Sequence, residues 1–195
     1  MAKPVTIRPA TQADARAIAE LYQIAAEGVA DYIWQGLEDE YPGLSGVEIG
    51  AARYARPNEL FSYENCLMAE VDGHVAGMVM AFVTETDGEP LPDDFDPVIR
   101  PFAELEEDKS LYISGIAVFE QFRGLGIGTT LMDEVEQRAR RDAHPSLSLI
   151  VFEANQGAAR LYQRLGFEET ARRAIYPHPL IHVTGDALLM VRPLD

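Results

Sequence analysis

The chain has 195 residues, of which 16 are lysine or arginine and 32 are aspartate or glutamate, so its formal charge at pH 7 is −16. Nucleic acid is excluded as an expected partner because phosphate backbones are bound by clustered basic residues, and no apolar stretch approaches the roughly 20 residues that cross a bilayer. Together with a single cysteine, which cannot form an internal disulfide, this predicts one domain over residues 1–195 of a cytoplasmic protein without membrane attachment.

The first 83 residues contain short segments with the hydrophobic periods of strands and helices. In chain order we predict a strand at 5–8, a helix behind the N-cap Thr11, helices at 29–36 and 47–56, and strands at 67–71 and 75–83. The last two strands are joined by Asp72-Gly73, a pair that favours a tight hairpin turn. This part therefore combines antiparallel strands with amphipathic helices.

Residues 84–110 form a polar, strongly acidic excursion, with one short helix predicted around Pro101 to Leu105. A connection of this length is uncommon unless it has a role, so we predict a lid or a contact of a homodimer. The following segments are a strand at 111–118, a glycine-rich turn, a helix through 131–139, a strand at 147–152, a helix at 155–165 and strands at 168–175 and 187–192. This order predicts an α/β (α+β) fold with one mixed, twisted sheet of about six or seven strands and helices on both faces.

The segment from Ile116 to Gly128 carries the clearest chemical signal. An apolar strand ends there, a glycine-rich turn follows, and an amphipathic helix begins at once. Glycines bring backbone amides close to a ligand, and a helix start adds unpaired N–H groups, so this pattern predicts a phosphate site with Arg123 beside it. A dinucleotide site is disfavoured because Thr129 stands where its third glycine belongs, and a P-loop is disfavoured because Gly-Lys-Ser/Thr is absent. The diphosphate of coenzyme A and a glycine turn without a ligand remain.

Two spaced motifs resemble a known family. The run Gln121-Phe122-Arg123-Gly124-Leu125-Gly126 resembles the Q/R-x-x-G-x-G/A signature of the GNAT acetyltransferases. Downstream, residues 155–167 resemble the family's N-x-x-A-x-x-x-Y-x-x-L-G-F segment, including Asn155, Ala158 and Tyr162. Because both motifs occur in the family's order, the chain is identified as a suspected GNAT N-acetyltransferase that uses acetyl-CoA.

The resemblance implies a splayed sheet in which the arm of coenzyme A lies between the strands at 111–118 and 147–152. It implies that backbone groups of the first strand bind this arm and that the Val118 N–H polarises the thioester carbonyl. It assigns the diphosphate to the amides of the glycine loop. The residues so implied for cofactor binding are Ile116, Ala117, Val118, Arg123, Gly124, Leu125, Gly126, Ile127, Gly128, Thr129, Asn155, Ala158 and Tyr162.

The family's chemistry is direct attack of a primary amine, of a small molecule or a peptide, on the thioester. Tyr162 is then the general acid that protonates the departing thiolate, or alternatively a packing tyrosine. Asn155 contacts the cofactor, caps its helix, or does both. Glu153 is a tentative general base because it ends the strand facing the gap, although a surface carboxylate is the simpler interpretation. No metal is expected. A GNAT-fold module that binds acyl-CoA without turnover, as a sensor or regulatory subunit, is the alternative function.

Overall fold

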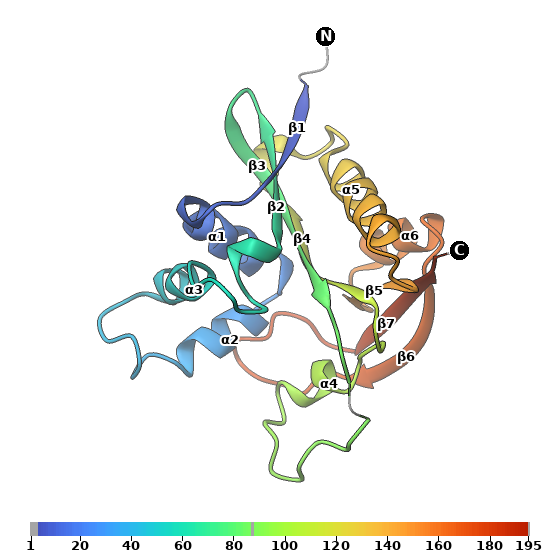
Figure 1. The fold of residues 1–195 in the computed structure, drawn as a ribbon. Coiled ribbons are helices and arrows are strands. Elements are labelled where there is room, and N and C mark those ends of the chain that lie inside the picture. Colours follow the sequence, from blue (N-terminus) through green and yellow to red (C-terminus); the bar gives the residue numbers. More distant parts are fainter. Residues whose placement is uncertain (1–3, 87, 195) are drawn as a thin grey trace. The chain divides into compact units, whose positions relative to one another are not determined.

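The computed structural model describes residues 4–86 and 88–194. Residues 1–3 and 195 of the predicted domain, and residue 87 of the predicted excursion, lie outside the described residues. One sheet has the strand order β1-β2-β3-β4-β5-β7-β6 (Figure 1). β4 and β5 are parallel, whereas β1 with β2, β2 with β3, β5 with β7 and β6 with β7 are antiparallel. The predicted mixed sheet of about six or seven strands is confirmed with seven.

The chain divides into two compact units. The first comprises residues 4–81 and 115–135, and the second comprises residues 82–86, 88–114 and 136–194. The strand β4 (Leu111–Val118) and the helix α5 (Ile127–Arg141) each contribute residues to both. Whether residues 1–195 fold as one domain, as the composition suggests, stays a prediction.

The first unit contains the predicted N-terminal strands and helices. Its elements are β1 (Val5–Pro9), η1 (Gln12–Asp14), α1 (Ala15–Ala25), α2 (Val29–Gln35), α3 (Gly46–Tyr54), η2 (Tyr63–Asn65), β2 (Cys66–Val71), most of β3 (His74–Val83) and η3 (Glu120–Phe122). The helices α1, α2 and α3 pack against one another (Figure 1), and Trp34 of α2 meets Tyr54 of α3 edge to face, with ring centroids 6.3 Å apart. Cys66 is buried in this unit, as its position beside an apolar strand predicts.

A charged cluster fixes the start of α1. The carboxylate of Asp14 accepts hydrogen bonds from both Nη atoms of Arg8, each at 2.8 Å, and from the Thr11 N–H at 2.7 Å. Arg8 also donates to Glu70 of β2 at 2.7 Å, so the cluster ties the helix start to the sheet. The hydrogen bonds from Arg8 are the main cause that lowers the pKa of Asp14 to about 2. The predicted N-cap at Thr11 is present, although the first turn is a 3-10 turn.

The second unit contains α4 (Arg100–Ala103), β5 (Ser146–Phe152), α6 (Gln156–Arg164), β6 (Glu168–Ala174) and β7 (Asp186–Pro193). Arg192 of β7 donates to both carboxylate oxygens of Glu136, each at 2.8 Å, and this ion pair fastens the second half of α5 to the sheet. Because both side chains are largely shielded from solvent, this pair is stronger than the exposed ion pairs of the surface.

The acidic excursion begins and ends at one point of the second unit. The Thr84 N–H donates to the Ser110 carbonyl at 3.2 Å, and the Lys109 N–H donates to the Thr84 carbonyl at 2.8 Å. The buried hydroxyls of Ser110 and Ser148 lie 2.5 Å apart, which connects this closure to β5. The predicted short helix is α4, found at Arg100–Ala103.

The helix α4 packs on strands of its own unit. Phe102 meets Phe152 of β5 edge to face, with centroids 6.0 Å apart, and Arg173 of β6 donates to Glu104 at 2.7 Å. These contacts hold the middle of the excursion as well as its ends. The lid and the homodimer contact both stay predictions.

The Asp14 cluster makes a testable contribution to stability. Asp14 has a depressed pKa, so its contribution is present above its ordinary pKa of 3.8 and is lost as the pH falls from there towards 2. We expect Asp14→Asn to lower the free energy of unfolding at pH 7 by about 2 kcal/mol. Chemical unfolding at pH 7 and below pH 3 measures this difference, which shrinks at the lower pH.

Glu20→Gln is the control, because the ion pair of Glu20 with Arg16 on α1 is exposed and such pairs contribute less than about 1 kcal/mol. A loss for Asp14→Asn that is equally large at pH 7 and below pH 3 would show that the ionised carboxylate is not what stabilises the helix start.

Candidate functional site

The glycine loop between β4 and α5 has a conformation that depends on two of its glycines. Gly124 and Gly126 both have a φ of +78°, in the left-handed region where other residues are strained. The loop is preceded by η3, in which the Arg123 N–H donates to the Glu120 carbonyl at 3.1 Å, and is followed by the first turn of α5. The two glycines thus allow the turn that connects η3 to the start of α5.

Six successive backbone amides in this loop, those of residues 124–129, have no acceptor among the described residues. The amides on either side are paired, since Arg123 donates to Glu120 and the Thr130 N–H donates to the Gly126 carbonyl at 3.0 Å. Most of the loop is exposed, and a Cβ added at Gly124, Gly126 or Gly128 would meet no atom within 4 Å. A row of free N–H groups at the positive end of a helix binds anions.

Arg123 adds a full positive charge to this row. Its side chain is exposed and makes no ion pair with any residue that the structure describes. In a chain of charge −16, such a cation counters the repulsion that an anionic ligand would meet. The donors and the charge therefore fit a diphosphate.

The end of β4 presents backbone groups in the first unit. Gly115 and Ala117 are buried, whereas Ile116 and Val118 are half-buried, as alternation along a strand requires. The Phe119 N–H donates to the Ala76 carbonyl of β3 at 2.9 Å. Because adjacent residues of a strand direct their N–H and C=O groups to opposite sides, we infer that those of Val118 point away from β3.

Tyr162 of α6 has a buried ring and an accessible hydroxyl. The ring packs on Phe167 with centroids 5.9 Å apart, and burial raises the pKa of Tyr162 to about 12. No buried side-chain oxygen or nitrogen of the described residues lacks a hydrogen-bond partner, and the Tyr162 hydroxyl bonds to none of those residues. This hydroxyl must therefore reach the surface, and it remains protonated at neutral pH.

Asn155 caps α6, which is one of its two predicted roles. Its Oδ1 accepts a hydrogen bond from the Ala158 N–H at 3.1 Å, as the side chain of an N-cap residue does. The side chain is exposed, and its Nδ2 group donates to no described residue. The cap leaves that amide group available, so a role in cofactor binding stays a prediction.

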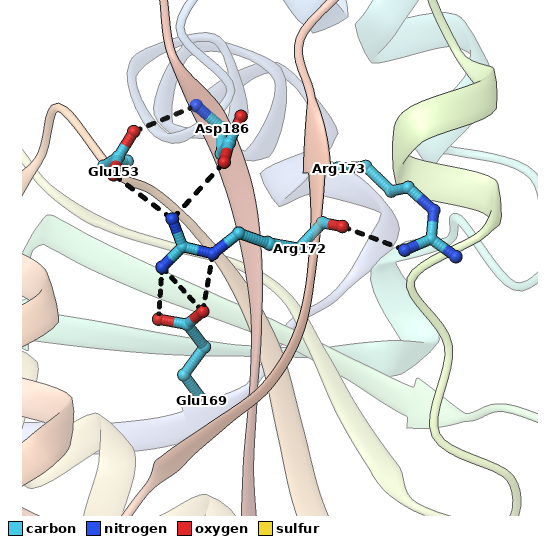
Figure 2. Close-up of polar contacts among 5 residues, drawn as sticks. All are labelled: Glu153, Glu169, Arg172, Arg173 and Asp186. Carbon is cyan, nitrogen blue, oxygen red and sulfur yellow. Dashed lines mark hydrogen bonds and ion pairs between the residues drawn. The ribbon is translucent and has the colours of Figure 1, made fainter.

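Glu153 follows the last residue of β5 and belongs to a cluster of charged residues (Figure 2). Its Oε1 lies 3.4 Å from Nη1 of Arg172, and its Oε2 accepts a hydrogen bond from the Asp186 N–H at 3.3 Å. Arg172 also lies 3.4 Å from the Asp186 carboxylate and donates twice to Glu169, at 2.8 and 2.9 Å. Half of the Glu153 side chain is exposed, so its carboxylate is held in place but remains accessible.

A β-bulge in β6 assembles this cluster. Glu169 pairs with Met190 of β7, whereas Ala171 pairs with the next residue, Leu189, so one extra residue lies between them on β6. In a regular strand, residues three positions apart point to opposite faces. The bulge brings Glu169 and Arg172 to the same face, where their side chains meet.

The second unit thus brings Glu153, Asn155, Ala158 and Tyr162 together along the end of β5 and α6. The other predicted site residues, from Ile116 to Thr129, belong to the first unit. Sequence reasoning missed the contacts of Glu153 with Arg172 and Asp186, which neither motif covers.

Residues 4–86 and 88–194 contain neither a metal-binding cluster nor a membrane-spanning helix. No group of three or more His, Cys, Asp or Glu side chains there is arranged to hold a metal ion. In the same residues, each helix is too short or too polar to cross a membrane.

Comparison with known proteins identifies the family. A sequence profile described as the acetyltransferase (GNAT) family matches residues 30–167. The chain belongs to the GNAT acetyltransferase family. An N-alpha-acetyltransferase of Sulfurisphaera tokodaii is 33% identical over 120 residues, which cover 58% of this chain and 68% of that protein. The predicted enzyme class, N-acetyltransferase, is confirmed.

Solved structures confirm the GNAT fold. An N-acetyltransferase from Staphylococcus aureus Mu50 superposes with a TM-score of 0.66 at 22% identity and covers 95% of this chain and 99% of its own. A GNAT family acetyltransferase from Elizabethkingia anophelis with acetyl-CoA bound has a TM-score of 0.60 at 22% identity, covering 97% and 98% of the two chains. At this identity the likeness concerns the fold alone.

The conformation of the glycine loop can be tested by two matched substitutions. Gly126→Ala places a Cβ on a backbone with a φ of +78°, so we expect the free energy of unfolding to fall by about 1 kcal/mol through strain. Gly128→Ala lies in the first turn of α5, where a Cβ would meet no atom within 4 Å and the backbone is helical, so it should be neutral or stabilising. Chemical unfolding of both variants measures the difference. Equal stabilities would mean that the loop does not need the left-handed conformation at Gly126.

Proposed function

We propose that this GNAT family member transfers the acetyl group of acetyl-CoA to a primary amine by direct attack. The observation that carries this proposal is the row of six unpaired amides at residues 124–129, in a loop that is mostly exposed, with Arg123 beside it. These groups fit the diphosphate of coenzyme A. Bound acetyl-CoA would supply a thioester, at which a C–N bond to the amine forms as the C–S bond breaks.

Backbone groups of β4 bind the rest of the cofactor in this proposal. The N–H and C=O groups of Ile116 and Val118 hydrogen-bond to its arm, and the Val118 N–H lies at the thioester oxygen. The orientation of the Val118 backbone away from β3, inferred from the bond between Phe119 and Ala76, supports this assignment. An N–H placed where negative charge develops lowers the barrier by about 3 kcal/mol in comparable enzymes. Ala117 contributes its buried side chain to the packing of the strand.

Residues of α6 complete the cofactor side. Tyr162 donates a proton to the departing thiolate, a role supported by its accessible hydroxyl and by burial, which keeps its pKa at about 12 and the phenol protonated. Asn155 offers its Nδ2 group to the arm of the cofactor while its Oδ1 caps the helix at Ala158.

The amine loses a proton to Glu153, directly or through water. Half of this side chain is exposed, and its carboxylate is held at the end of β5. The acceptor is a small molecule or a peptide with a primary amine, and the charge of −16 favours a cationic one by electrostatic attraction.

The general acid is tested by Tyr162→Phe, which removes only the hydroxyl. We expect kcat to fall by about a hundredfold, with the affinity for acetyl-CoA unchanged, because a general acid contributes at least that much. Tyr176→Phe is the matched control, since Tyr176 is an exposed tyrosine of the same unit. Steady-state kinetics with each amine that the wild type accepts measures both. Unchanged turnover of all these amines by Tyr162→Phe would remove the acid role.

The diphosphate site is tested by titrating acetyl-CoA into the protein in a calorimeter. We expect the wild type to bind and Arg123→Gln to bind about tenfold more weakly, since a charge-assisted hydrogen bond contributes about 1.5–3 kcal/mol. Arg56→Gln, which removes an exposed charge of the same unit, should bind like the wild type.

An acetylation screen with polyamines, aminoglycosides, amino acids and peptides with free N-termini then identifies the acceptor. Binding of acetyl-CoA without turnover of any of these amines would favour a regulatory module. A wild type that does not bind acetyl-CoA would contradict the proposal.

A further inference from the structure

The contacts of Glu153 are more specific than those of a surface carboxylate. One oxygen is held by the N–H of Asp186 at 3.3 Å, and the other faces Arg172 at 3.4 Å. The absence of a side chain at Gly185 makes room for this arrangement, because a Cβ there would lie 2.9 Å from Oε2 of Glu153. The φ of Gly185 is +94°, which also requires glycine. The position of the carboxylate is therefore set by Arg172 of β6, Asp186 at the start of β7 and Gly185 just before that strand.

Arg172 is oriented by another residue rather than by Glu153. Its Nε and Nη2 atoms donate to the two oxygens of Glu169 at 2.8 and 2.9 Å, which is a two-point contact of the strong, directional kind (Figure 2). Nη1 then points at Glu153 and Asp186 over longer distances, 3.4 Å to each. Glu153 thus lies in the field of a fixed cation without being tightly paired to it.

This arrangement surrounds Glu153 with charges of both signs. A positive charge a few ångströms away favours the ionised form of a carboxylate, while the carboxylates of Glu169 and Asp186 oppose that effect. Among the described residues, the charged groups that these contacts bring to Glu153 are Arg172 and Glu169 of β6 and Asp186 of β7. Removing Arg172 takes away the cation that these contacts bring to Glu153 and leaves the carboxylates of Glu169 and Asp186.

We propose, on the basis of the function proposed above, that Arg172 is a positioning residue for the reaction. It holds the Glu153 carboxylate at the end of β5 and sets the pH range in which Glu153 takes the proton from the attacking amine. The proton leaves the amine nitrogen and binds an oxygen of Glu153, while Arg172 itself neither gains nor loses one. The β-bulge at Thr170 is the backbone feature that makes this possible, because it turns Arg172 and Glu169 to one face.

The neighbouring arginine supplies a matched control. Arg173 follows Arg172 on the same strand and is about equally exposed, but its partners are Glu104, which follows α4, and the Arg172 carbonyl. Arg173→Gln and Arg172→Gln therefore remove the same charge one residue apart, and only Arg172→Gln removes it from Glu153. Arg172→Lys keeps the charge but loses the planar two-point contact with Glu169.

Two readouts test the proposal. The first is an NMR titration of the Glu153 carboxylate in the protein alone, which requires no substrate. The second is the pH dependence of kcat/KM with one amine throughout, the one that the wild type acetylates fastest. In Arg172→Gln we expect the Glu153 titration and the acidic limb of the rate profile to move together to higher pH, because a nearby cation is removed.

Arg173→Gln should leave the titration and the rate profile unchanged, and Arg172→Lys should restore most of the wild-type profile. Glu153→Gln should abolish the limb assigned to Glu153. Gly185→Ala, which keeps every charge but displaces the carboxylate, should lower kcat at all pH values and leave the KM for acetyl-CoA unchanged. Its fold is checked by the same NMR spectrum.

Three results would overturn the proposal. The first is a Glu153 titration that does not move in Arg172→Gln. The second is a titration that moves while the rate profile stays in place, which would mean that Glu153 is not the base. The third is an effect of Arg173→Gln equal to that of Arg172→Gln. A wild type that acetylates no amine at all contradicts the proposed function instead, and the NMR titration still shows whether Arg172 controls the charge of Glu153.

Discussion

Backbone hydrogen bonding is the constraint on which the proposed site depends. A polypeptide pairs nearly all of its N–H groups, so six successive amides without an acceptor in the described chain are unusual. They are kept apart from carbonyls by the two left-handed glycines, Gly124 and Gly126, and by the first turn of α5, whose N–H groups have no partner within the helix. The bond between Phe119 and Ala76 anchors the strand from which this loop begins. The local fold thus maintains a row of unpaired donors.

The same chain has twice as many acidic as basic residues, and some of its arginines each contact more than one carboxylate. Arg8 contacts Asp14 and Glu70, and Arg172 contacts three carboxylates. Sharing one cation among several anions lets an acidic protein hold its elements together with few basic residues. It also leaves Arg123, which pairs with none of the described acidic side chains, as a distinct group at the glycine loop.

Much of the fold could be predicted because its signals are local. The hydrophobic period of residues 111–118, the Asp72-Gly73 turn and the Thr11 cap each specify structure within a few residues, and the corresponding strands and helix start were found. The glycine loop could be located because its left-handed backbone conformation requires glycine at Gly124 and Gly126. The two GNAT motifs also allowed the fold and the enzyme class to be predicted.

The environment of Glu153 could not be predicted, because it depends on register. Arg172 lies 19 residues away in the chain, and its side chain reaches the cluster only because β6 contains one extra residue. Nothing in the run of charged residues at 168–173 reveals that bulge, and a regular strand would have directed Glu169 and Arg172 to opposite faces. The pairing of β6 with β7 thus determines the distances between Glu153 and its charged neighbours.

The closure at Thr84 and Ser110 has a consequence for how this protein can vary. The excursion leaves the sheet and returns to it through two backbone hydrogen bonds and a buried pair of serine hydroxyls. Since the entropy cost of a closed loop rises by only about 0.6 kcal/mol when its length doubles, the parts of the excursion that α4 does not hold against β5 and β6 can change in length at little cost. A longer or shorter sequence in those parts would leave the two backbone hydrogen bonds of the closure in place.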